Sequence, residues 1–130
     1  MPGELILVVE DNDNNRLLVR DVLQASGYRV VEAENAEDGL RVAVEQRAAL
    51  ILMDIQLPGM NGIEALQRLR ADPATRAIPV IAVTASAMTQ DRRQIMAAGF
   101  DGYQAKPIEV TQFVAAVRTA VGRPAERDRT

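Results

Sequence analysis

Asp54 ends an apolar stretch, Leu50–Met53, and a segment rich in turn-forming residues follows it in the sequence LILMDIQLPGMNG. A carboxylate at the end of a buried strand costs free energy unless a partner compensates its charge. Polar residues follow other apolar stretches in the same way, and these are Glu10, Asp11, Thr84 and Lys106. Lys106 is the single lysine of the chain, which makes its position at such a point notable.

These residue types together suit phosphoryl transfer. The carboxyl ends of parallel strands meet at one edge of an open α/β sheet, so Glu10, Asp11 and Asp54 are expected to converge there. Three close carboxylates repel one another unless a cation lies between them. A hard divalent cation, the Lys106 ammonium and the Thr84 hydroxyl would neutralise a phosphoryl group, and an aspartate can carry it covalently. Taken singly, a strand-end aspartate such as Asp54 is more simply a cap or turn former, the pair Lys106-Pro107 is more simply a surface turn, and Thr84 alone indicates nothing. Asp13 is interpreted as a helix cap or first-turn acid.

The composition narrows the chemistry further. The chain has 130 residues, a formal net charge of -3, no histidine and no cysteine. The charge gives no indication of nucleic-acid or membrane binding. Without histidine or cysteine, a metal must be held by oxygen ligands, which favours a hard ion such as magnesium or calcium. Magnesium is the expected cofactor, with manganese as an alternative. No stretch is long enough for a signal peptide or a membrane span, so a cytoplasmic location is expected.

Apolar periodicity predicts an alternation of strands and helices. The expected strands are 5–9, 29–33, 50–53, 80–83 and a weaker 102–105. The expected helices are 15–25, 36–46, 62–70, 89–98 and 110–121. Such an alternation implies parallel strands joined by crossover helices, in an α/β fold covered on both faces. Residues 1–122 are interpreted as one domain, and residues 123–130 as a flexible tail.

Four segments carry a resemblance to a known family: ILVVEDNDNNR, LILMDIQLPGMNG, PVIAVTASAM and AAGFDGYQAKPI. The chain resembles the CheY-like receiver domains of two-component response regulators. It looks nearest to stand-alone receivers of the DivK type and to receivers of hybrid histidine kinases. The resemblance implies a flavodoxin-like (βα)5 fold with strand order 2-1-3-4-5, and a phosphoacceptor signalling protein rather than an enzyme. Such receivers catalyse their own phosphorylation and dephosphorylation.

The resemblance also implies a role for each matching residue. Asp54 would be the phosphoacceptor, assisted by Lys106 and Thr84. The metal ligands would be the carboxylates of Glu10, Asp11 and Asp54 and the backbone carbonyl of Gln56. The pair Glu10-Asp11 replaces the two aspartates more usual in the family. Lys106 and Pro107 would be joined by a cis peptide bond, and Thr84 and Tyr103 would form the switch.

Signal output would use the face of the fourth helix, fifth strand and fifth helix. The residues expected on it are Met88, Arg92, Arg93, Gln104 and part of 110–118. The implied partners are a histidine kinase or histidine phosphotransfer protein and a downstream protein target. Pairing of two copies through the same face stays open, and no direct contact with nucleic acid or membrane is expected.

Three alternatives remain at this point. A phosphohydrolase of the haloacid dehalogenase type also places an aspartate after a strand, but it needs a second acid where this chain has Gln56. A flavin or nucleotide binder needs a glycine-rich loop after the first strand, where this chain has Glu-Asp-Asn-Asp. A receiver piece of a hybrid histidine kinase or larger regulator is the third. The initial methionine and the lack of an output domain favour a stand-alone receiver.

Overall fold

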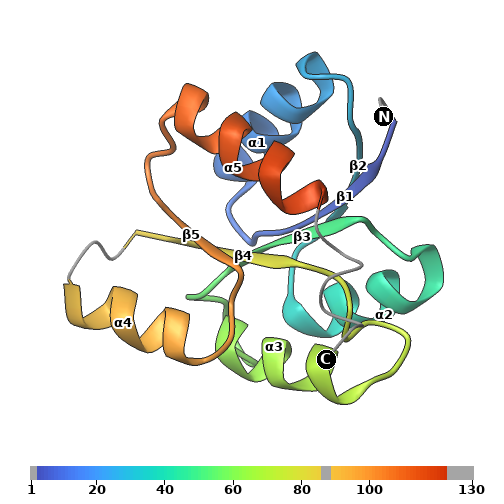
Figure 1. Cartoon of the computed structure of the whole chain (residues 1–130), viewed down its shortest axis with the longest axis vertical. Coiled ribbons are helices and arrows are strands. Elements are labelled where there is room, and N and C mark those ends of the chain that lie inside the picture. The colour runs from blue at the N-terminus through green and yellow to red at the C-terminus, as the bar shows by residue number, and fades with distance from the viewer. Residues whose placement is uncertain (1–2, 86–88, 123–130) are drawn as a thin grey trace.

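Figure 1 shows the computed structural model, which describes residues 3–85 and 89–122. Within these residues, five strands alternate with five helices, as the periodicity predicts. The strands are β1 (Leu5–Val9), β2 (Arg29–Ala33), β3 (Leu50–Asp54), β4 (Val80–Thr84) and β5 (Gly102–Ala105). The helices are α1 (Asp13–Ala25), α2 (Ala36–Gln46), α3 (Gly62–Ala71), α4 (Thr89–Ala97) and α5 (Val110–Val121). Met88 and the expected tail, 123–130, lie outside the described residues.

The strands form one parallel sheet in the order β2-β1-β3-β4-β5, which confirms the predicted fold. Helices α1 and α5 cover one face, and α2, α3 and α4 cover the other (Figure 1). Alternate residues of each inner strand enter the two cores, so that Val8 packs toward α1 and α5 while Leu7 packs on the opposite side. Burial on both faces explains why the inner strands are apolar throughout.

Three helices begin in the same way. The side chains of Asn12, Asn35 and Asn61 each accept a hydrogen bond from the backbone N–H three residues further on, at the starts of α1, α2 and α3. This contact satisfies one of the otherwise unpaired N–H groups of a first helical turn. Because Asn12 is the cap, α1 begins at Asp13, two residues before the predicted start. Asp13 is therefore the first-turn acid of the two roles expected for it.

Two predicted strand ends are wrong by one residue, and the correction matters for the site. β3 and β4 include Asp54 and Thr84 instead of ending before them. The ladder continues because Asp54 lies in register with Val83 and the Ile55 N–H donates to the Val83 carbonyl at 3.2 Å. Both side chains are thus held on the sheet itself.

No helix among the described residues is long and apolar enough to cross a membrane.

Candidate functional site

The polar residues predicted to converge do meet at the carboxyl edge of the sheet. Lys106, which follows β5, places its Nζ atom 2.6 Å from Glu10 Oε1 and 3.1 Å from Asp54 Oδ2. The Lys106 N–H also donates to the Thr84 carbonyl at 2.8 Å, which ties the end of β5 to the end of β4. The Lys106 ammonium group therefore contacts Glu10, a residue 96 positions earlier in the sequence.

Asp54 is held at both carboxylate oxygens. It is 4% exposed, and its Oδ1 atom accepts the Gln56 N–H at 2.9 Å while Oδ2 receives Lys106. The loop behind it is equally fixed, because the Gly62 N–H donates to the Ile55 carbonyl at 3.1 Å. A Cβ atom at Gly62 would lie 2.6 Å from the Asp54 carbonyl oxygen, so a glycine is required for this close approach. The carboxylate is thus presented in one orientation.

Glu10 is buried, and its two oxygens have different partners. Oε1 contacts Lys106, and Oε2 accepts the Asn12 N–H at 3.1 Å. Burial raises the pKa of Glu10, and the neighbouring Asp54 adds to this, although Lys106 and the Asn12 N–H oppose it. Burial lowers the pKa of Lys106, but the hydrogen bonds and charges of Glu10 and Asp54 outweigh it, so that the pKa lies above its usual value.

The acidic residues fit a hard cation. One carboxylate oxygen each from Glu10, Asp11 and Asp54 lies within 4.8 Å of the others; Asp11 is exposed and the other two are buried. Every side-chain atom of this group that could bind a metal is an oxygen, as magnesium prefers, and the exposed Asp11 leaves room for water ligands. Gln56 lies two residues after Asp54 in the same loop, and its backbone N–H donates to Asp54 Oδ1.

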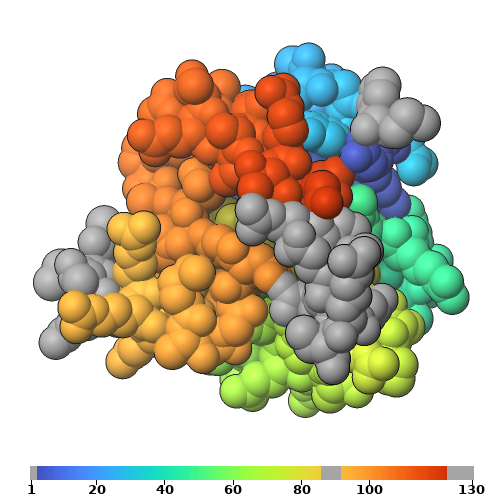
Figure 2. All heavy atoms as spheres, in the orientation of Figure 1, coloured from blue at the N-terminus to red at the C-terminus, as the bar shows by residue number. Residues whose placement is uncertain are grey.

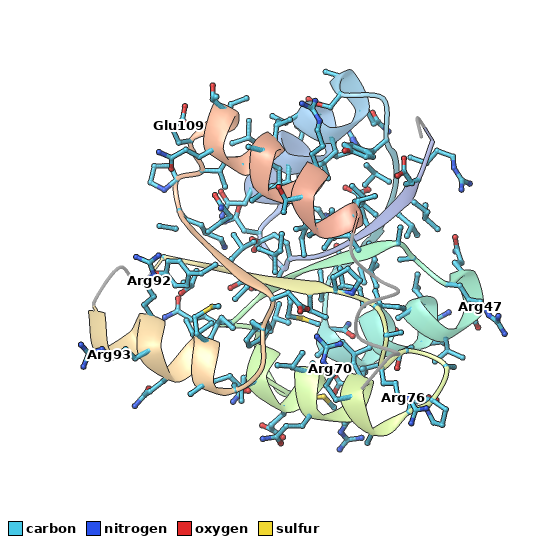
Figure 3. All side chains as sticks on the ribbon, viewed as in Figure 1. Arg47, Arg70, Arg76, Arg92, Arg93 and Glu109 are labelled. Carbon is cyan, nitrogen blue, oxygen red and sulfur yellow. The ribbon has the colours of Figure 1, made fainter. Side chains whose placement is uncertain are left out.

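Apart from Met88, which lies outside the described residues, and those on α5, the expected switch and output residues lie on β4, β5 and α4. Thr84 is 1% exposed at the end of β4, and Tyr103 is half-buried on β5 beside Ala82. Arg92 and Arg93 are exposed on α4 (Figure 3), and Gln104 is half-buried. The Arg92 Cζ atom lies 5.5 Å from the centroid of the Tyr103 ring, within range of a cation–π contact. The Lys106–Pro107 peptide bond is cis.

Sequence reasoning missed Arg16. Its side chain reaches back from α1 and donates to the Glu10 carbonyl oxygen at 2.9 Å, directly beside the acidic pair. The sequence offered one signal for this contact, an arginine one helical turn after the Asn12 cap. An arginine in that position is usually a solvated helix residue, so the spacing by itself could not distinguish the two cases.

The parallel α/β fold and the polar residues at the carboxyl edge of its sheet together indicate one protein family. The family model of the response regulator receiver domain matches residues 6–118, and the chain belongs to that family. Among individual proteins, the chain is 44% identical over 117 residues to the polar-differentiation response regulator DivK of Brucella anthropi. That alignment covers 90% of this chain and 95% of the relative. DivK of Brucella ovis is 42% identical over the same length.

Solved structures show the same relationship. The receiver domain of the sensor histidine kinase PA1611 from Pseudomonas aeruginosa is 36% identical, with a TM-score of 0.85, over 92% of this chain and 98% of that one. It has a magnesium ion coordinated in its active site cleft. The chemotaxis protein CheY4 of Vibrio cholerae shares the fold at 24% identity, with a TM-score of 0.84, over 91% of this chain and 98% of that one.

Proposed function

We propose that this chain is a single-domain response regulator of a two-component phosphorelay, with Asp54 as its phosphoacceptor. The observation that carries the proposal is the buried Asp54 carboxylate, held 3.1 Å from Lys106 Nζ and grouped with the oxygens of Glu10 and Asp11. The metal would be held by the carboxylates of Glu10, Asp11 and Asp54 and by the Gln56 backbone carbonyl. It would be magnesium, with manganese as an alternative. When bound, it supplies positive charge that offsets the negative charge of the transferring phosphoryl group.

The donor is a phosphohistidine on a histidine kinase or histidine phosphotransfer protein. It cannot lie on this chain, because the chain has no histidine of its own. An Asp54 carboxylate oxygen forms a bond to phosphorus as the nitrogen–phosphorus bond of the donor breaks. The leaving imidazole keeps the bonding electron pair and takes up a proton from solvent. Lys106 remains beside the new acyl phosphate as a fixed positive charge, so the product is stabilised without further rearrangement of the sheet.

The signal would pass from the phosphoryl group through Thr84 and Tyr103. The Thr84 hydroxyl moves toward the phosphoryl oxygens, and the Tyr103 ring turns into the space that it leaves, which biases a two-state surface. That surface is formed by α4, β5 and α5, which lie side by side in Figures 1 and 2. Met88, Arg92, Arg93 and Gln104 would contact the downstream protein there, and two copies of the chain could pair through it.

Residues 1–122 would be the receiver domain, the chain would be a signalling protein rather than an enzyme, and its location would be the cytoplasm. The near-complete coverage of the DivK relative, 95% of its length, supports a stand-alone regulator. The 36% identity to a receiver domain of a sensor histidine kinase supports the alternative, a receiver piece of a larger protein. The length of the native transcript decides between these two.

Acetyl phosphate tests the proposal without a cognate kinase. The protein is incubated with acetyl phosphate, with magnesium or with chelator, and weighed by intact mass spectrometry beside Asp54→Asn. We expect one phosphoryl adduct that requires magnesium and is lost in the variant. Asp21→Asn is the control, because Asp21 is an exposed acid that pairs with Arg20 and lies outside the acidic group, and it should retain the adduct. Absence of both the adduct and a beryllofluoride complex in the folded wild-type protein would refute the proposal.

A further inference from the structure

Arg16 lies between the acidic loop and a group of surface carboxylates. Its side chain is only 15% exposed, although it comes from the first turns of α1. Nη1 donates to the Glu10 carbonyl oxygen at 2.9 Å, and Nη2 lies 2.6 Å from Asp13 Oδ1. The same guanidinium is 3.7 Å from Glu32, on β2, and 3.4 Å from Glu34, just after β2. The side chain is therefore fixed from several sides.

This contact completes the anchoring of the Glu10 backbone. The Glu10 N–H donates to the Ala33 carbonyl of β2 at 3.0 Å, and the Glu10 carbonyl accepts from Arg16. Both polar groups of the Glu10 main chain are thus fixed, at the point where β1 ends and Asp11 begins. The direction in which Asp11 leaves the strand depends on the peptide group that Arg16 holds. A planar guanidinium suits this role because it binds a carbonyl and a carboxylate at the same time.

The charge of Arg16 is already balanced by its acidic neighbours. The hydrogen bond that Arg16 donates to Asp13 raises the pKa of Arg16, and the charges of Asp13, Glu34 and Glu32 act in the same direction. The guanidinium is therefore charged throughout the working pH range. Its net electrostatic effect on a nearby cation would be repulsive, so removing it would strengthen metal binding if charge were all that mattered.

We infer that Arg16 is a positioning residue for the acidic pair. By holding the Glu10 carbonyl, it orients the Glu10–Asp11 main chain so that the carboxylates of Glu10, Asp11 and Asp54 converge on one cation. The inference rests on the proposed function, because the cation is the magnesium ion of that proposal. Groups that orient metal ligands without contacting the metal often change metal affinity tenfold or more when they are removed. Positioning and charge thus predict opposite signs for the same substitution.

Magnesium titration of three variants separates the two effects. The affinity is measured by calorimetry on folded protein for wild type, Arg16→Gln, Arg16→Lys and Arg20→Gln. Arg20→Gln is the matched control, because Arg20 lies one turn further along α1 and also faces Glu32, at 3.8 Å, but pairs with Asp21 rather than with the acidic loop. We expect Arg16→Gln to weaken magnesium binding about tenfold. Arg16→Lys should also weaken it despite keeping the charge, and Arg20→Gln should leave it unchanged or slightly tighter.

The backbone amides of Asp11 and Asn12 give a second measurement that needs no metal. Their NMR resonances should shift in Arg16→Gln and Arg16→Lys but not in Arg20→Gln. Unchanged or tighter magnesium binding by Arg16→Gln would overturn this inference but not the proposed function. Wild-type affinity in Arg16→Lys would have the same consequence. A wild-type protein that binds no magnesium would overturn the proposed function, and this inference with it. If Arg16→Gln does not fold, Arg16→Lys against Arg20→Lys makes the same comparison.

Discussion

At the scale of one residue, the buried carboxylate of Glu10 affects the stability of the fold in a way that depends on pH. This carboxylate is buried next to Asp54, and burial raises its pKa. A carboxyl whose pKa is higher in the folded than in the unfolded protein stabilises the fold at pH values below its ordinary pKa. This stabilisation disappears as the pH rises through the folded-state pKa. At neutral pH the ionised Glu10 therefore lowers the free energy of unfolding, a cost that a metal-binding role would explain.

We predict that Glu10→Gln is more stable than wild type at neutral pH in the presence of a chelator. The difference in the free energy of unfolding should be absent below pH 4.5, the ordinary pKa of glutamate, and grow as the pH rises above it. Urea denaturation at several pH values measures it. Glu45→Gln, an exposed glutamate paired with Arg41 at 3.2 Å, should change stability by no more than about 0.5 kcal/mol. A Glu10→Gln protein less stable than wild type at pH 7 would contradict this account.

At the residue scale, the sequence could predict which polar groups meet, because their position at strand ends determines their location. Glu10, Asp11, Asp54, Thr84 and Lys106 were grouped in this way, and the structure brings them together. The contact of Arg16 with the Glu10 carbonyl and that of Arg92 with Tyr103 could not be predicted. Each depends on the path of a long side chain between two elements, which periodicity does not describe.

At the scale of elements, the loop between β3 and α3 depends on the close contact at Gly62. A Cβ atom there would lie 2.6 Å from the Asp54 carbonyl oxygen and 2.9 Å from Ile55 Cα, both of them backbone atoms that cannot move independently. The loop that presents Asp54 and the first turn of α3 are therefore packed directly on each other. The same contact orients the proposed phosphoacceptor and holds the first residue of α3 against the loop.

We predict that Gly62→Ala lowers the free energy of unfolding by about 1–3 kcal/mol, the usual cost of forcing an extra carbon into a packed site. Gly102→Ala is the control, since its added carbon would meet the side chain of Ile81 at 3.3 Å, and this side chain can adjust. Urea denaturation compares the two variants. Equal losses of stability would show that the backbone contact at Gly62 has no special cost.

Element order and type followed from the sequence because each apolar stretch has a clear period and a clear stop. The ends were less certain. α1 begins two residues before its predicted start because Asn12 caps it, and apolar periodicity does not show where the polar first turn begins. The last residues of β3 and β4 were missed because a polar side chain usually marks the end of a buried strand. Here the ladder continues through Asp54 and Thr84.

At the scale of the whole molecule, the α/β class could be derived from the residues, but the strand order could not. Apolar strands separated by amphipathic helices require a parallel sheet covered on both faces. Periodicity does not say which strands are neighbours, and the order 2-1-3-4-5 came from the family resemblance. That order places β1 and β3 side by side at the centre, which brings Glu10 and Asp11 next to Asp54.

The position of the phosphoryl group on the modified protein shows whether Asp54 is the phosphoacceptor. After reaction with acetyl phosphate and magnesium, sodium borohydride reduces an acyl phosphate to an alcohol, so that a phosphorylated aspartate becomes homoserine. Peptide mass spectrometry then locates the modified residue. We expect homoserine at position 54 and at no other acid, in a yield that falls when magnesium is chelated. Homoserine at Asp11 or Asp13 instead, or an unmodified position 54 in protein that carries the phosphoryl group, would contradict it.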